Sequence, residues 1–175
     1  MNQKIILYIA QSLDGFIARE DGSLDWLTQY DSKDQDYGYN DFLKGIGVVV
    51  MGNNTYRQVL TFGDFPYKNK ACFVFSNDIS KTNENDVTFV NGDVAKIIEE
   101  IKKNHKGDIW LVGGAMLIDE FLKHEMVDEF IVTTIPVIIG RGIPLFSKDN
   151  SENKLQLVEI KSYKNGLLQA HYKKI

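Results

Sequence analysis

The chain of 175 residues is 43% hydrophobic and 25% charged, as in ordinary globular proteins, and carries a net charge of -4. The acidic balance argues against a nucleic-acid partner, because phosphate contacts require a basic surface. The apolar runs are too short for a signal peptide or a membrane-spanning helix, and the single cysteine, Cys72, excludes an internal disulfide. We therefore expect one cytoplasmic domain over residues 1–175, with no membrane partner.

Short runs rich in β-branched and aromatic residues predict eight strands. They lie at Lys4–Ala10, Gly47–Met51, Ala71–Ser76, Val87–Val90, Ile109–Val112, Glu129–Ile139, Leu155–Tyr163 and Leu167–Lys173. The Asn-Gly pair at 165–166 predicts a hairpin between the last two strands. The Asp-Gly pair at 14–15 is compatible with either a hairpin turn after the first strand or a loop that follows one long strand.

Amphipathic segments between these strands predict four helices. They span Asp36–Lys44, Asn54–Leu60, Val94–Lys103 and Ala115–Lys123, and Asp93 is placed to cap the third. Strands and helices alternate until the final hairpin. This order predicts an α/β fold with a mostly parallel central sheet, helices on its faces and an antiparallel C-terminal hairpin.

Two predicted strands end in glycine immediately before a predicted helix, at Gly52 and at Gly113-Gly114. Glycine lets the backbone approach a ligand closely, and a helix N-terminus presents unpaired N–H groups to an anion. A third strand end adds Ser76 and Asn77, whose hydroxyl and amide groups suit ribose and phosphate. A tight turn would explain either junction alone, but the repetition predicts a cofactor that carries a diphosphate. The G-x-G-x-x-G fingerprint of Rossmann folds is absent.

The order and spacing of further segments resemble the dihydrofolate reductase superfamily, and more closely the lone reductase domains similar to the C-terminal half of the riboflavin-biosynthesis deaminase–reductase RibD. The matching segments are Ser12–Ala18, Asp25–Leu27, Val50–Tyr56, Val112–Ala115, Val127–Glu129, Pro136–Gly142 and Pro144–Phe146. The resemblance implies a three-layer α/β/α fold, NADPH as hydride donor, and a pterin-like or ribose-bearing substrate.

The same resemblance implies which residues hold the cofactor. Gly113, Gly114, Ala115 and Met116 would lie against the diphosphate; Gly52, Asn53, Asn54 and Thr55 would contact the adenosine side and the diphosphate; Ser76 and Asn77 would lie near the adenine ribose; Ala10 and Ile17 would line the nicotinamide pocket. NADPH-specific members carry arginine where this chain has Asn53. NADH therefore stays possible, and Arg57, one helical turn further on, either replaces that arginine or is solvated.

Asp36 is the candidate active-site carboxylate, at the position where dihydrofolate reductases hold theirs. On the predicted helix Asp36–Lys44 it borders an apolar face formed by Tyr39, Phe42 and Leu43. The margin of an apolar pocket can raise the pKa of a carboxylate, which suits proton donation or substrate orientation. A solvated or N-capping aspartate is the alternative.

Four further residues are candidates for the substrate end of the site. The resemblance implies Trp26 over the substrate and Thr133 as the hydroxyl partner of Asp36. Tyr56 either stacks on a ligand or packs in the core. Lys70 is the nearest match to the arginine that holds the glutamate tail of folate, and because lysine offers no bidentate fork, true dihydrofolate reduction is disfavoured.

Two interpretations of function stay open. The favoured one is an NAD(P)H-dependent reductase acting on a small heterocycle or a phosphoribosylamino-pyrimidine, as 5-amino-6-(5-phosphoribosylamino)uracil reductase does; the other is a non-catalytic regulatory module that retains a nucleotide pocket. The three histidines have no ligand spacing, so no metal is expected. The resemblance also implies pairing of two copies through the last strands, and Thr134–Ile139 followed by Leu155–Val158 supplies the apolar surface for an isologous homodimer.

Overall fold

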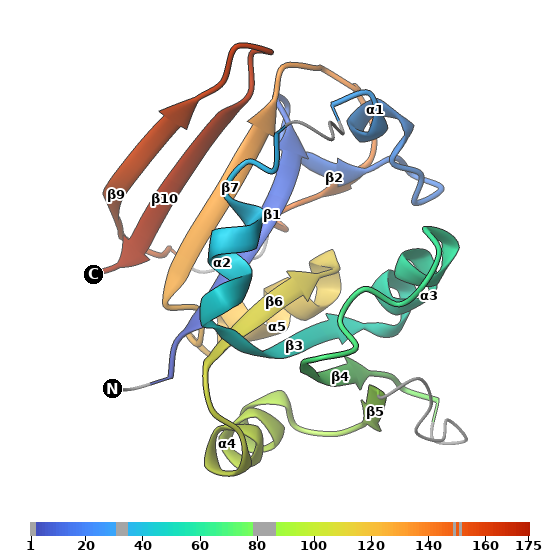
Figure 1. The fold of residues 1–175 in the computed structure, drawn as a ribbon, viewed down its shortest axis with the longest axis vertical. Helices are drawn as coiled ribbons and strands as arrows, with labels where there is room; N and C mark the ends of the chain where they lie inside the picture. The colour runs from blue at the N-terminus through green and yellow to red at the C-terminus, as the bar shows by residue number, and fades with distance from the viewer. Residues whose placement is uncertain (1–2, 31–34, 79–86, 149, 151) are drawn as a thin grey trace.

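The computed structural model describes residues 3–30, 35–78, 87–148, 150 and 152–175, and a β-sheet lies at its centre. The strands of this sheet are β1 (Ile5–Ser12), β3 (Ile46–Gly52), β4 (Ala71–Phe75), β5 (Val87–Val90), β6 (Asp108–Gly113), β7 (Glu129–Ile135), β9 (Leu155–Ser162) and β10 (Leu168–Lys174). They lie in the order β5-β4-β3-β6-β1-β7-β10-β9, and the pairs from β5 to β7 are parallel (Figure 1). β10 runs antiparallel to both β7 and β9, which confirms the predicted C-terminal hairpin.

Helices cover both faces of the sheet, as Figure 1 shows. They are α1 (Asp25–Thr28), α2 (Tyr39–Gly45), α3 (Asn53–Thr61), α4 (Val94–Asn104) and α5 (Ala115–Lys123). Side chains of α4 and α5 share a core with Val48 and Val50, whereas α2 and α3 share the opposite core with Val49 and Met51. All four of these β3 side chains are fully buried, because alternate residues of a strand point to opposite faces. The predicted three-layer α/β/α architecture is confirmed.

The parallel strands bring their carboxyl ends to one edge of the sheet. Towards one side of β6 the sheet continues through β3, β4 and β5, and towards the other it continues through β1 and β7. In open α/β sheets a ligand crevice forms beyond the carboxyl ends, where the strand order reverses. The glycine junctions after β3 and β6 lie at this edge.

Two strand predictions need correction. The strand predicted over Glu129–Ile139 ends at Ile135, because Pro136 has no N–H to donate to a neighbouring strand. The segment after Asp14-Gly15 forms β2 (Phe16–Ala18), which pairs antiparallel with β8 (Ile143–Pro144) instead of with β1. The hairpin interpretation at Asp14-Gly15 is therefore wrong.

The second helix also begins later than predicted. It starts at Tyr39, because Gly38 has a left-handed backbone with φ of 83° and so interrupts the helix. Asp36 consequently lies in the turn before α2 and not in its first turn.

The helices are short throughout the described ranges. α1 has four residues, too few for the helical periodicity that revealed the longer segments, and the sequence did not predict it. No helix in the part of the chain that the structure describes combines the length and the apolar character needed to cross a bilayer.

Candidate functional site

The ends of β3 and β6 lie side by side, and each strand continues directly into a helix. Gly52 ends β3 before α3, and Gly113 and Gly114, joined by a cis peptide, connect β6 to α5. A Cβ built on Gly52 would lie 3.7 Å from the nitrogen of Gly114, and one on Gly114 would lie 3.3 Å from Oγ1 of Thr55. The two junctions are therefore in contact, and a larger residue at either would fill the space between them.

The helices that follow these junctions have no side-chain cap. The N-cap residues of α3 and α5 are Gly52 and Gly114, which have no side chain to accept a hydrogen bond. The N-cap of α4, by contrast, is Asp93, whose carboxylate accepts a hydrogen bond from the nitrogen of Lys96 at 3.1 Å. The first-turn N–H groups of α3 and α5 are therefore available to an anion at the shared edge.

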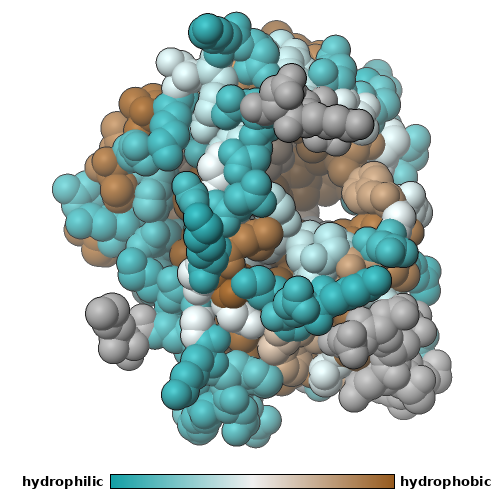
Figure 2. Space-filling model, viewed as in Figure 1, coloured by the Kyte–Doolittle hydropathy of each residue, from teal (hydrophilic) through white to brown (hydrophobic). Residues whose placement is uncertain are grey.

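A cleft of about 1580 Å³ opens at this edge. Figure 2 shows the surface hollowed between α2 and α3. The cleft is larger than the roughly 300–1,000 Å³ of pockets for single small ligands, so it has room for a dinucleotide together with a substrate.

The cleft collects most of the residues that the sequence associates with a cofactor. All the predicted cofactor residues except Gly113 line it: Ala10, Ile17, Gly52, Asn53, Asn54, Thr55, Ser76, Asn77, Gly114, Ala115 and Met116. Gly113 is buried beneath them. Met116 is 82% exposed, at the first turn of α5. The structure thus brings together residues from the ends of β1, β3, β4 and β6.

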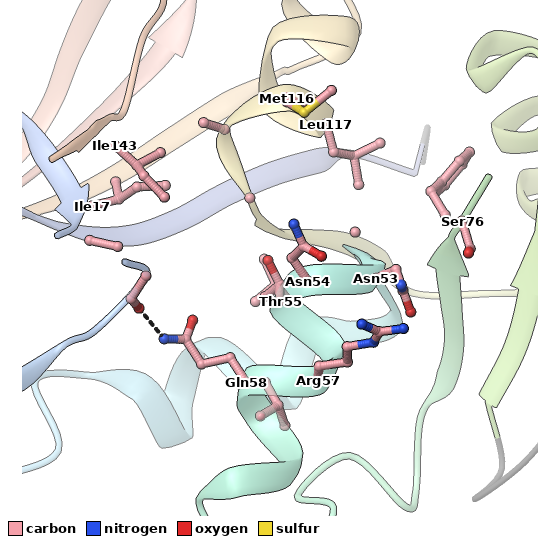
Figure 3. Close-up of a pocket in the computed structure, with 18 of the residues that line it drawn as sticks. Ile17, Asn53, Asn54, Thr55, Arg57, Gln58, Ser76, Met116, Leu117 and Ile143 are labelled. Atoms are coloured by element: carbon pink, nitrogen blue, oxygen red, sulfur yellow. Dashed lines mark hydrogen bonds between the residues drawn. The ribbon is translucent and has the colours of Figure 1, made fainter. Parts of the chain in front are cut away.

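The two ends of the cleft differ in polarity. Figure 3 shows Ile17 and Ile143 at one end and Ser76 at the other. Ile9 also lines the cleft and packs against the same core cluster as Ile17. An apolar wall excludes water and suits a neutral ring, whereas the amide and hydroxyl groups at the Ser76 end suit a sugar.

Gln58 connects the cleft's opposite walls, a feature that the sequence analysis missed. Its Nε2 donates a hydrogen bond of 2.6 Å to the carbonyl oxygen of Gly22, in the loop after β2 (Figure 3). Only the tertiary structure joins these residues, which are 36 positions apart. The bond holds the loop that forms the wall at the apolar end.

The side chains that line the cleft are predominantly acidic. Six carboxylates belong to its described lining: Glu20, Asp21, Asp64, Asp78, Asp93 and Glu120. Arg57 is the one lysine or arginine among them. An anionic ligand would therefore depend on backbone N–H groups and on Arg57 for its attraction.

Asp36 lies outside the lining of this cleft and is exposed. Its two carboxylate oxygens each accept a backbone hydrogen bond of 3.1 Å, one from Gly38 and one from Asn40. These bonds favour the ionised form and hold the pKa of the carboxyl below its usual range. The expected rise in its pKa is therefore wrong: Asp36 is a solvated carboxylate that braces the turn before α2, two residues ahead of the N-cap Gly38.

Trp26 on α1 and Thr133 on β7 are both buried and also lie outside the cleft lining. The Oγ1 of Thr133 accepts a hydrogen bond of 3.0 Å from Gln169 Nε2, whereas the Asp36 carboxylate accepts from Gly38 and Asn40, which corrects the predicted pairing. The Gln169 amide also lies 3.3 Å from the hydroxyl of Tyr8 and 3.3 Å from the carbonyl oxygen of Tyr37. We call these four residues the Gln169 network.

The Gln169 network joins segments far apart in the sequence, so the sequence analysis did not find it. Burial raises the pKa of Tyr8 to about 12, so its hydroxyl stays protonated at neutral pH. Trp26 lies close by, 3% exposed, and its Nε1 has no hydrogen-bond partner among the described residues. Tyr8 also stacks on Phe42 of α2, with ring centroids 4.4 Å apart, so aromatic side chains pack between α2 and β1.

The structure does not support the substrate-binding assignments of Tyr56 and Lys70. Tyr56 is 1% exposed and packs edge-on against Phe65 and Phe89, so it is a core residue. Lys70 donates hydrogen bonds to the carbonyl oxygens of Leu43 and Ile46, at 2.8 and 2.5 Å. Lys70 therefore stabilises the connection between α2 and β3. It does not serve as the anchor for a folate tail that the sequence comparison suggested.

The RibD C-terminal domain model matches residues 3–169. The chain belongs to this family. In support, it is 41% identical over 173 residues to the uncharacterized protein YwjB of Bacillus subtilis (strain 168), with 98% of each chain covered.

Solved structures agree with this membership. A protein of Shewanella sp. PV-4, provisionally named for riboflavin biosynthesis, is 31% identical and superposes with a TM-score of 0.89, covering 99% of both chains. Dihydrofolate reductase from Enterococcus faecalis, solved with NADP(H) and RAB-propyl, has a TM-score of 0.71 at 18% identity, covering 99% of this chain and 98% of that one. The second likeness shows a dihydrofolate reductase-like fold and, at this identity, the fold alone.

Proposed function

We propose that the protein is an NAD(P)H-dependent reductase that transfers a hydride to a small heterocyclic substrate of the phosphoribosylamino-pyrimidine type, as in the reductase step of riboflavin biosynthesis. The observation that carries the proposal is the pair of uncapped helix N-termini, α3 and α5, that face one large cleft. Membership of the RibD C-terminal domain family supports it.

The residues present fit a dinucleotide. The diphosphate would accept hydrogen bonds from the first-turn N–H groups of α3 and α5, and the missing Cβ atoms of Gly52 and Gly114 leave room for its approach. The adenine ribose would lie by Ser76 and Asn77, and the nicotinamide by Ala10 and Ile17. When bound, the reduced cofactor supplies the hydride.

The chain's own residues would orient the reactants and exclude water. The apolar end of the cleft around Ile17 and Ile143 would keep water from the nicotinamide, and the Gln58–Gly22 hydrogen bond would hold its wall in place. Asp36, with its lowered pKa, is ionised at neutral pH and would orient a substrate N–H group instead of donating a proton. Trp26 and Thr133 would act as positioning residues behind the pocket.

The proposal is tested by titrating the protein with NADPH and NADH and then following cofactor oxidation against a set of pterins and pyrimidines. We expect micromolar binding of a reduced dinucleotide and oxidation that depends on a substrate. Binding of neither dinucleotide would overturn the proposal.

A second candidate function is a nucleotide-binding module without catalysis. The observation that favours it is the distance of the catalytic candidates from the cleft: Asp36, Trp26 and Thr133 all lie outside its lining. This candidate predicts dinucleotide binding with no oxidation by any substrate in the set, so the same experiment separates it from the reductase.

We also propose that two copies associate through the C-terminal edge of the sheet. β9 is an edge strand whose Leu157, Val158 and Ile160 are about half exposed, and Ile138 is 70% exposed in the predicted contact segment. Exposed edge strands with apolar side chains are liable to pair with another chain. Light scattering at micromolar concentration should give twice the 20.0 kDa mass of the chain, and a monomer mass would remove this proposal.

A further inference from the structure

Arg57 is the only basic side chain of lysine or arginine type in the described lining of the cleft, and it is exposed there. It forms no hydrogen bond or ion pair with any residue that the structure describes. A cation left unpaired beside several carboxylates points to a ligand anion as its partner. We infer that Arg57 binds the 2′-phosphate of the cofactor's adenosine and thereby selects NADPH over NADH. This inference rests on the proposed reductase function and adds to it the determinant of cofactor choice.

The position of Arg57 assigns it to the adenosine end of the cleft. It lies on α3 four residues after Asn53, so both side chains project from the same face of the helix. Figure 3 shows the guanidinium next to the Asn53 amide, on the side of α3 that faces Ser76. Ile17 and Ile143 lie at the opposite end of the same view. Arg57 is therefore remote from the expected nicotinamide position.

The neighbouring polar groups suit a phosphorylated ribose. Ser76 is 8% exposed, and its Oγ accepts a hydrogen bond of 3.1 Å from the nitrogen of Asp78. Its O–H donates to no described residue, so one buried donor is left for a ligand oxygen. The Oδ1 of Asn53 is buried with no donor in the described structure. A hydroxyl donor near an arginine matches the acceptor oxygens of a phosphate, and an amide matches a ribose hydroxyl.

Because of the surrounding negative charge, Arg57 should determine the affinity for NADPH and have little effect on the affinity for NADH. Asp78 and Asp93 also line this end of the cleft. Their negative charges oppose a phosphate dianion but leave the uncharged 2′-hydroxyl of NADH almost unaffected. With arginine at position 57, NADPH gains a charge-assisted, bidentate contact. Without it, NADPH meets only like charge, so its affinity should fall below that of NADH.

The test compares Arg57→Gln and Arg57→Lys with the parent chain, by calorimetric titration of NADPH and NADH. Arg141→Gln is the matched control, since Arg141 is exposed and does not line the cleft. We expect the parent to bind NADPH more tightly than NADH. Arg57→Gln should weaken NADPH about 10- to 100-fold and leave NADH within about twofold. Arg57→Lys should keep part of the preference, because lysine retains the charge without the fork.

Each other outcome has a separate meaning. A parent preference for NADPH that survives in Arg57→Gln would overturn the role of Arg57 and leave the reductase proposal intact. Equal binding, or tighter binding of NADH, by the parent would also overturn the inference alone. Equal weakening of both cofactors in Arg57→Gln would assign Arg57 to the shared diphosphate and not to the 2′-phosphate. Binding of neither cofactor by the parent would overturn the proposed function and this inference together.

Discussion

The two halves of the candidate site differ in what forms them: backbone junctions in one and a network of side chains in the other. The half formed by the ends of β3, β4 and β6 consists of strand–glycine–helix junctions, and the predicted cofactor residues meet there in one cleft. The half that holds the predicted catalytic residues consists of side chains from distant segments, several of them joined by the Gln169 network, and those catalytic candidates lie outside the cleft lining. Backbone geometry at a junction follows from local sequence, whereas a side-chain network depends on the whole fold.

The largest effect should come from adding a methyl group at the junction. Gly114 has φ of -81°, which alanine adopts freely, so Gly114→Ala should fold. Its Cβ would lie 3.3 Å from Thr55 Oγ1, in the space through which the diphosphate would approach. We expect dinucleotide binding to weaken about 100-fold, or about 2.7 kcal/mol, by calorimetry.

The control for this change is Gly45→Ala, at the end of α2, where an added Cβ would meet no atom within 4 Å. It should leave the dissociation constant unchanged. Normal binding by Gly114→Ala would show that the diphosphate does not lie at the junction.

The next effect concerns the half that holds the predicted catalytic residues. Asn has one acceptor oxygen where Asp36 has two, so Asp36→Asn removes the charge and keeps one of the two hydrogen bonds that Asp36 accepts from Gly38 and Asn40. If Asp36 orients the substrate, kcat/KM should fall about 10-fold or more while cofactor binding stays constant. Because its pKa is lowered, the activity of the parent should show no titration by Asp36 between pH 5 and 8.

Asp41→Asn provides the comparison, since Asp41 is exposed on α2 and pairs with Lys44. It should not alter turnover. Full activity in Asp36→Asn would instead restrict Asp36 to a structural role in the turn before α2 and would remove it from the reaction.

The difference between the two halves also explains which parts of the site could be predicted from the sequence. The bounds of α5 were predicted residue for residue, because its apolar periodicity starts directly after a glycine pair. The cofactor residues followed from the same junctions. The prediction that Lys70 binds substrate was wrong, because Lys70 donates hydrogen bonds to carbonyl oxygens 24 and 27 positions away. No local sequence pattern predicts such distant partners.

Two local elements, the start of α2 and the short strands β2 and β8, were predicted wrongly or not at all for a different reason. Asp36 was assigned to a helix because the apolar pattern of Tyr39 and Phe42 extends one turn too far back, across Gly38. Strands β2 and β8 have three and two residues, which is too short for alternation to be recognised. Their pairing depends on segments more than 120 positions apart.

A smaller effect tests whether the Gln169 network supports the fold or only the site. Gln169→Met would leave Thr133 and Tyr8 without their buried donor, which should lower the free energy of unfolding by about 1–3 kcal/mol. Chemical denaturation measures the change, with exposed Gln156→Met on β9 as the control. Cofactor binding should be unaffected, and parental stability would mean that the network's geometry serves the ligand alone.

The smallest expected effect returns to the caps that distinguish α4 from α3 and α5. Asp93 caps α4, and the hydrogen bond from the Lys96 nitrogen holds the pKa of its carboxyl below the ordinary 3.8. Asp93→Ala should therefore lower the melting temperature by about 2–4 °C at neutral pH. Because a lowered pKa stabilises the fold only while the carboxyl is ionised, the difference should persist above pH 3.8 and vanish as the pH falls through the lowered value. Asp93→Asn should retain the cap without this pH dependence. A difference that stays constant down to low pH would mean that Asp93 stabilises α4 by packing and not by its charge, and the contrast with the uncapped helices would then lose its electrostatic basis.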